Sequence, residues 1–386
     1  MAERVATVDH ERFDIDPERG FIPGTDPLAS FGTNAHLFLQ ELDKLSHNIP
    51  DLLETGRFRP SVRQLETPDP VLFDELTNRE LARVYTITGF LANAYVHKID
   101  SPTKKTIPAG VAVPLYESTK RLGTTPVLSY DAYVLYNWIR DDSNQELLPQ
   151  NVRSMTNFFA PEDERWFIAI HVAIENRAGP AIAAIGDAQQ GVYENDADRV
   201  GDALRTIERS IQDITTILNR MPERNNPEMY GTGFRPYLKP LTNIKYEGVG
   251  ALTGRQSFRG ASGAQSSILP ALDAALGIDH GTNPLVGHLR ELRKDMPAAH
   301  QEFVEAVETE PSIRDYVENS SDELRDTYND CIDQLVTFRD DHIDIVAKYI
   351  SGPLDKSKGT GGTPFSRYLE TFTDDTEESR LSSPSQ

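Results

Sequence analysis

Cysteine is almost absent from this sequence of 386 residues, in which Cys331 is the only one. A single thiol excludes a disulfide framework, a zinc site built from cysteines and a cysteine-ligated iron–sulfur cluster. Long apolar runs are also absent. The longest, around residues 166–174, spans about nine residues, whereas a transmembrane helix needs about 20. We therefore expect no membrane span.

Positive charge is scarce, with 39 lysine and arginine residues against 60 acidic ones and a formal net charge of −21. Such a surface repels nucleic-acid backbones and anionic lipids, so neither is an expected partner. The first sixteen residues mix both charges and lack the apolar run of a signal peptide, which predicts a cytoplasmic protein. The acidic excess fits adaptation to high salt as well as an ordinary acidic cytosolic protein.

Helical periodicity dominates the sequence from Asp163 onward. Apolar residues recur every three or four positions in three stretches, which predict helices over residues 163–178, 195–220 and 321–351. Asn195 is the expected N-cap of the second helix, and Ser320 with Glu323 has the spacing of a capping box for the third. Before residue 155, the same spacing predicts a helix around residues 81–94, whereas the alternation in residues 110–118 suggests a strand or an extended edge.

Irregular segments are the next candidates for function. Residues 225–263 are rich in glycine, proline and tyrosine, and a loop of this length inside a compact domain is usually functional or disordered. Its aromatic content favours function. The glycine-rich segments 248–254 and 358–363 lack the spacing of phosphate-binding loops. The second is either a flexible connection or a mobile lid over a ligand.

Two histidines lie on apolar helix faces. His342 falls on the stripe of the third predicted helix, and His171 lies within WFIAIHVAIE, one turn after Phe167. A buried imidazole is costly unless it is hydrogen-bonded or bound to a metal. Each alone is more often a satisfied core histidine than a ligand. Two of them on separate apolar helices fit the arrangement of haem proteins, in which one imidazole binds the iron.

Several segments together resemble the indoleamine 2,3-dioxygenase family. They include FRGASGAQSSILPALDAALGI (258–278), MPAAHQEFVEAVETEPSIRDYV (296–317), FRDDHIDIVAKYI (338–350) and KGTGGT (358–363). The resemblance covers about residues 13–372. With the helical patterns, it implies a mainly all-α fold, with a smaller, mostly helical N-terminal domain over residues 1–157 and a large helical haem domain over 158–372. We expect residues 373–386 to form a disordered tail.

The resemblance also implies an activity, in which both atoms of dioxygen are inserted across the indole C2–C3 bond of L-tryptophan to give N-formylkynurenine. The implied cofactor is haem b, with an unidentified electron donor that keeps its iron reduced, and we expect a monomer, with oligomers left open. His342 matches the iron ligand and His171 a catalytic position. The other matched positions are Arg235, Phe167, Tyr130, Tyr230, Ser262, Gly263 and Thr360 for the substrate, and Arg339, Ala261 and Ser262 for the haem.

The sequence departs from the familiar family pattern in two places. His171 stands where the mammalian enzymes have serine, and Tyr230-Gly231 replaces two phenylalanines of the pocket. A histidine that accepts the indole N–H favours tryptophan over N1-substituted analogues. Two other functions remain open, namely reversible dioxygen binding by a carrier or sensor, and action on a modified tryptophan. A carrier would have no use for the carboxylate anchor Arg235.

Overall fold

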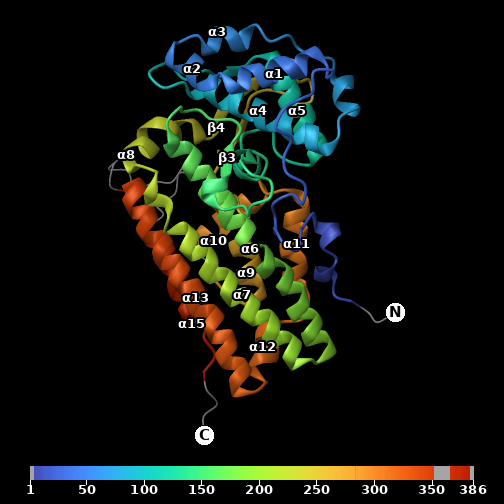
Figure 1. The fold of residues 1–386 in the computed structure, drawn as a ribbon, viewed down its shortest axis with the longest axis vertical. Coiled ribbons are helices and arrows are strands. Elements are labelled where there is room, and N and C mark those ends of the chain that lie inside the picture. Colours follow the sequence, from blue (N-terminus) through green and yellow to red (C-terminus); the bar gives the residue numbers. More distant parts are fainter. Residues whose placement is uncertain (1–3, 283, 352–365, 383–386) are drawn as a thin grey trace.

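A smaller layer of helices covers one end of a larger helical body (Figure 1). The computed structural model describes residues 4–282, 284–351 and 366–382. The smaller layer comes from the N-terminal part of the chain, and the body is built around long helices. The predicted mainly all-α fold is confirmed. In the smaller layer the helices are α1 (Leu37–His47), α2 (Ile49–Glu54), α3 (Phe58–Arg63), α4 (Asn78–His97) and α5 (Ala109–Leu122).

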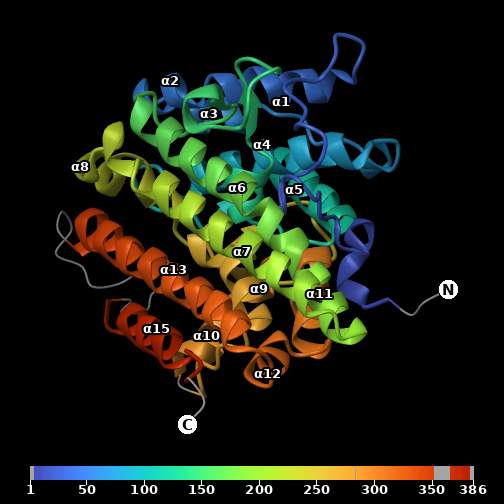
Figure 2. The same cartoon turned by 60° about the horizontal axis from the view of Figure 1, so that its bottom comes forward.

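The body has two long helices packed side by side, with a third along them (Figure 1). These are α6 (Glu162–Glu194), α7 (Ala197–Leu218) and α13 (Asp322–Val346). Figure 2 shows the last helix, α15, lying next to α13. The remaining described helices are α8 (Pro227–Met229), α9 (Ile268–Ala275), α10 (Pro284–Arg293), α11 (Ala298–Thr309), α12 (Ile313–Glu318) and α15 (Ser366–Glu378).

Two small sheets complete the described fold. In the first, β4 (Leu241–Tyr246) pairs in parallel with β1 (Thr106–Ile107) and antiparallel with β5 (Gln256–Phe258). In the second, β2 (Trp138–Arg140) and β3 (Val152–Ser154) form an antiparallel pair. Because β1 follows α4 and β4 lies in the later part of the chain, the first sheet ties the smaller layer to the body.

Several helix boundaries differ from the sequence-based expectations. Helix α6 continues past residue 178 and through Pro180, because the apolar residues beyond that proline are buried as well. Asn195 ends α6 in a left-handed conformation (φ 54°), and Asp196 caps α7 by accepting a hydrogen bond from the Arg199 N–H. The Asn195 N-cap was therefore wrong by one residue.

The other long helix is capped differently from the prediction. Ser321 caps α13 by accepting from the Leu324 N–H, in place of Ser320. The last predicted turns form a π-helical segment, η10 (Ala347–Ser351). The predicted stop at residues 352–353 lies outside the described residues.

Two predictions in the terminal parts of the chain were wrong. Residues 110–118, expected as a strand or an extended edge, belong to helix α5. The apolar side chains of α5 are buried almost all round, so they form no helical stripe.

At the C-terminal end, residues 373–378 complete helix α15 and are not part of a disordered tail. Phe372, Thr376 and Leu381 are buried there, although the surrounding composition is polar.

A buried carboxyl group fixes the start of α6 against the connection from the smaller layer. Glu164 Oε2 accepts hydrogen bonds from the backbone N–H groups of Phe158 (2.8 Å) and Phe159 (2.7 Å). Its Oε1 accepts from the Tyr133 hydroxyl (3.0 Å). Burial raises the pKa of Glu164 to about 8, and these three donors oppose the rise. The Glu164 carboxyl group therefore sets where α6 begins relative to Tyr133.

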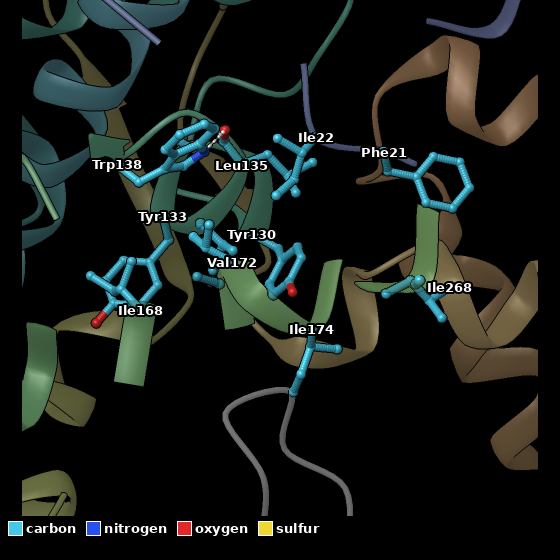
Figure 3. Packing of buried hydrophobic residues seen from close by; sticks show 14 of the residues in the cluster. Phe21, Ile22, Tyr130, Tyr133, Leu135, Trp138, Ile168, Val172, Ile174 and Ile268 are labelled. Atoms are coloured by element: carbon cyan, nitrogen blue, oxygen red, sulfur yellow. Dashed lines mark hydrogen bonds between the residues drawn. The ribbon is translucent and has the colours of Figure 1, made fainter. Parts of the chain in front are cut away.

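The same region contains the apolar core in Figure 3, where Tyr130, Tyr133 and Trp138 lie near the side chains of α6. The dashed line marks the hydrogen bond from the Trp138 indole N–H to the Leu135 carbonyl (2.9 Å). This bond satisfies the one polar group of a fully buried ring. The core thus fixes the π-helical segment η4 (Asp131–Leu135) above α6.

Candidate functional site

One cavity of about 630 Å³ lies in the helical body. Helices α6, α7, α9 and α13 contribute to its wall, together with η4, the π-helical segment η7 (Tyr230–Phe234) and the 3₁₀ turns η8 (Arg235–Leu238) and η9 (Gly263–Gln265). Three π-helical segments, η4, η7 and η10, each supply lining residues. Such segments are rare and concentrate at functional sites.

Every described residue that the sequence analysis matched to a haem or substrate position lines this cavity. They come from segments more than 200 residues apart in the sequence. Thr360 lies outside the described residues, and Gly231 is buried in η7 without lining the cavity. The lining residues from the prediction are Tyr130, Phe167, His171, Tyr230, Arg235, Ala261, Ser262, Gly263, Arg339 and His342.

His171 has a defined tautomer. Its Nδ1 lies 2.8 Å from the carbonyl oxygen of Phe167, one turn earlier on α6. Because a carbonyl only accepts, Nδ1 carries the hydrogen and Nε2 keeps a lone pair. Burial lowers the pKa of His171, and the bond to the carbonyl opposes this shift only in part. The ring is therefore neutral at pH 7, with Nε2 available as a hydrogen-bond acceptor.

His342 lies on α13 and is partly accessible because it faces the cavity. Within the part of the chain that the structure describes, neither ring nitrogen has a hydrogen-bond partner, and the ring is parallel to Phe338 (interplanar angle 2°). The pKa of His342 is lowered to about 4, mainly by burial and also by His171 and the charge of Arg339. The neutral imidazole thus offers a lone pair with no described protein donor to use it.

The aromatic wall surrounds Phe167. Its ring centroid lies 4.3 Å from that of His171, 5.4 Å from that of Tyr230 and 5.5 Å from that of Phe234. Tilted contacts at these separations are favourable for aromatic rings. This wall can hold a flat aromatic ligand beside the His171 imidazole.

Arg235 begins η8 and supplies a guanidinium group to the same cavity. Burial raises the pKa of Tyr230, while the positive charge of Arg235 and its hydrogen bond to the Tyr230 hydroxyl oppose the rise. The two side chains are therefore in contact. A guanidinium at an apolar wall is suited to bind a carboxylate by two parallel hydrogen bonds.

The loop before α9 is held in place by its own polar groups. Ser262 Oγ accepts from the Ala264 N–H, and Gln265 Oε1 accepts from the N–H groups of Ser262 and Tyr130, both at 3.1 Å. A Cβ atom built on Gly263 would meet nothing within 4 Å. The loop is thus fixed to η4, and its glycine leaves space in the cavity.

Arg339 lines the cavity one turn before His342 and forms an ion pair with Asp273 of α9. Asp273 also contacts Nε2 of His280 (3.1 Å), and the other nitrogen of His280 contacts Asp375 of α15 (3.0 Å). The Nε hydrogen of Arg339 is buried and has no partner among the described residues. Arg339 therefore keeps donor capacity for an anionic group.

Sequence reasoning missed Glu175, a buried carboxyl group behind the cavity wall. Its Oε1 accepts hydrogen bonds from the Tyr130 hydroxyl (2.8 Å) and the Ser266 hydroxyl (2.7 Å), and both of these residues line the cavity. Burial raises its pKa to about 7. Only one feature of the sequence could have indicated Glu175, namely its position inside an apolar run, one turn after His171. Nothing else distinguishes it from the other residues among the sixty acidic ones.

Fold and site together define a mainly helical protein with an apolar cavity that presents two neutral histidines and an arginine. The family model described as indoleamine 2,3-dioxygenase matches residues 9–379. Indoleamine 2,3-dioxygenase 1 from Rattus norvegicus is 31% identical over 88% of this chain and 89% of its own length, and the Mus musculus protein of that name is 32% identical over the same shares. A 6-hydroxytryptophan 2,3-dioxygenase from Fusarium equiseti is 27% identical over 96% and 97%.

The chain belongs to the indoleamine 2,3-dioxygenase family, which confirms the resemblance seen in the sequence. The family supports an oxidoreductase that acts with dioxygen on tryptophan-like indoles, and it implies a haem cofactor. No helix among the described residues is both long and apolar enough to cross a membrane.

The cavity residues fit a haem. A porphyrin is a flat apolar group with two carboxylates and an iron that takes an imidazole. The lone pair of His342 has no described protein partner, and the buried Nε hydrogen of Arg339 has none either. The side chains of His342 and Arg339 both line the same largely apolar cavity. An iron ligand and a carboxylate would satisfy these two groups, which are otherwise costly to bury.

Proposed function

We propose that this protein cleaves the indole C2–C3 bond of L-tryptophan with dioxygen and releases N-formylkynurenine. One observation carries the proposal: three groups line the same cavity. They are His342, which has no described partner, the acceptor nitrogen of His171 and the guanidinium of Arg235. In the reaction one carbon–carbon bond breaks, and each carbon takes one atom of dioxygen. The products therefore balance without a further reductant.

His342 would bind the iron of haem b, and Arg339 would neutralise a carboxylate at its edge. When bound, the haem supplies the activation of dioxygen, which no amino-acid side chain provides. An unidentified electron donor would keep the iron reduced, and we infer that the protein acts as a monomer.

The protein's own residues position the substrate. Arg235 binds the tryptophan carboxylate, and the rings around Phe167 hold the indole plane. The Nε2 atom of His171 accepts a hydrogen bond from the indole N–H, because its other nitrogen is already committed to the Phe167 carbonyl. The apolar wall excludes water from the reacting carbons.

The direct test incubates the reduced holoprotein with L-tryptophan and air and measures N-formylkynurenine by its absorbance. His342→Ala should lose most of the haem absorption band, whereas His47→Ala, in helix α1 outside the cavity, should keep it. Full haem content in His342→Ala would contradict the ligand assignment.

Arg235→Ala tests the carboxylate anchor. It should raise the KM for tryptophan by about 100-fold with little change in haem content, because a charged hydrogen-bonded pair contributes about 1.5–3 kcal/mol. An unchanged KM would remove the anchor role. A reversible dioxygen carrier would bind dioxygen but form no product, and its dioxygen affinity would not depend on Arg235.

A second candidate is cleavage of a ring-hydroxylated tryptophan. Tyr230 brings a hydroxyl group to the cavity wall, and this hydroxyl contacts Arg235. One relative is named a 6-hydroxytryptophan 2,3-dioxygenase. Competition between tryptophan and 6-hydroxytryptophan for the holoprotein discriminates the two. A higher kcat/KM for the hydroxylated substrate, lost in Tyr230→Phe, would favour the second candidate.

A further inference from the structure

A second cavity of about 600 Å³ lies away from His171 and His342, between the end of α4 and the segment around β4. Three lysines line it, Lys98, Lys105 and Lys239, and Asp100 is the one acidic residue of the lining. Such a gathering of positive charge contrasts with the net charge of −21 of the whole chain.

None of these three lysines forms an ion pair with any residue that the structure describes. Lys105 Nζ donates a hydrogen bond to the Thr242 carbonyl (2.9 Å), which leaves its charge uncompensated. By contrast, many arginines of this protein pair with carboxylates, as Arg199 does with both Asp187 and Glu194. Positive charges gathered around a concave, low-dielectric surface attract anions strongly.

Two arginines fix the wall that carries the lysines. Arg59 donates to the backbone carbonyls of Tyr95 (2.9 Å) and Pro102 (3.0 Å). Arg255 donates to the carbonyls of Lys105 (2.7 Å) and Asn243 (3.1 Å). Both add positive charge while they hold the backbone in place, so the cationic cavity is built in advance of any ligand.

The pKa of the His97 ring is affected by the same lysines. Its Nε2 lies 3.2 Å from the Pro240 carbonyl oxygen. The pKa of His97 is lowered to about 4, mainly by burial and also by the charges of Lys239 and Lys105, while hydrogen bonds to backbone carbonyls oppose the shift. The lysine charges therefore reach the interior of the cavity.

We propose that this second cavity binds a small anion with at least two negative charges, of the phosphate-ester or pyrophosphate class. The lining carries three lysine charges against one carboxylate, and a compact polyanion matches this positive charge better than a singly charged carboxylate does. The concave shape favours a small molecule over an acidic protein surface.

An anion bound in this cavity would affect the first cavity through η8, which contributes residues to both. Arg235 and Leu238 line the first cavity, whereas Pro236 and Lys239 line the second. The Asn93 side chain fastens this turn to α4 by donating to the Tyr237 carbonyl (2.8 Å). An anion that draws Lys239 inward would thus change the KM for tryptophan more than kcat. This consequence alone rests on the proposed function.

The test is calorimetric titration of the holoprotein with pyrophosphate, without tryptophan and at low salt. Lys98→Gln/Lys239→Gln should bind at least about tenfold more weakly than the wild type, because two charge-assisted contacts are lost. Lys120→Gln on α5, an exposed lysine outside the cavity, is the matched control and should bind as the wild type does.

Equal affinity in the double variant and the wild type would overturn the proposal, as would an absence of binding by the wild type at low salt. Tight binding of poly-glutamate with no binding of pyrophosphate would also overturn the proposal, because it would show that the cavity binds an acidic protein and not a small anion. Inorganic phosphate that binds as tightly as pyrophosphate would narrow the ligand to a single phosphate group. Because the titration needs no turnover, its outcome is independent of the dioxygenase assignment.

Discussion

Glu175→Gln should flatten the dependence of folding stability on pH between about 4.5 and about 7. Burial raises the pKa of the Glu175 carboxyl group to about 7 from an ordinary value of 4.5, and its bonds from Ser266 and Tyr130 oppose the rise. Between these values the folded protein holds a proton that the unfolded chain has lost. Stability is therefore fully present below pH 4.5 and falls as the pH rises through 7.

The expected size follows from the two pKa values. A difference of about 2.5 units corresponds to about 3 kcal/mol, as an order of magnitude, because each unit is worth about 1.4 kcal/mol. Glutamine has nearly the same shape, and its carbonyl oxygen can still accept from Tyr130 and Ser266. It carries no titrating proton, so this part of the pH dependence should disappear.

Urea denaturation at intervals from pH 4.5 to 8 measures the effect as the difference in unfolding free energy between Glu175→Gln and the wild type. Glu164, whose pKa is also raised, titrates in both proteins and cancels in this difference. Glu302→Gln, at an exposed position on α11, is the control and should follow the wild type at every pH. A constant difference between Glu175→Gln and the wild type across this range would refute the reasoning.

Three further substitutions have defined outcomes. Asp43→Ala leaves the fully buried Arg83 without its partner and should cost about 3–5 kcal/mol of unfolding free energy in urea. Gly179→Ala places a Cβ atom 2.5 Å from the Glu18 carbonyl oxygen and should lower stability by about 1–3 kcal/mol, whereas Gly250→Ala, with open space around it, should not lower the melting temperature. His171→Ser removes the expected acceptor for the indole N–H and should raise kcat/KM for N1-methyltryptophan relative to tryptophan; an unchanged ratio in competition assays would contradict that role.

The long amphipathic helices were predictable because their apolar spacing is a local property of the sequence. The stripe of α13 and the apolar face of α7 follow from residues three and four apart, and α4 was found in the same way. Helix α5 was missed because it is buried almost all round and contains Pro114. A helix without a polar face has no stripe to detect.

The candidate site was predictable only in part. His171 and His342 stood out because an imidazole on an apolar stripe conflicts with its surroundings. Arg235, Ser262 and the aromatic positions came from the family resemblance, since nothing in their local sequence separates them from ordinary polar or core residues. Glu175 was missed because the donors that bind it, Tyr130 and Ser266, lie 45 and 91 residues away.

The sequence by itself determined the helical class, the family and the two histidines that the apolar stripes expose as anomalies. The tertiary structure alone decided that these histidines share one cavity, that His171 presents Nε2 to it, and that three lysines gather at a second cavity in an acidic protein. The reason is physical. Periodicity records which face of a helix is buried, whereas cavities and their charges arise where segments distant in the chain meet.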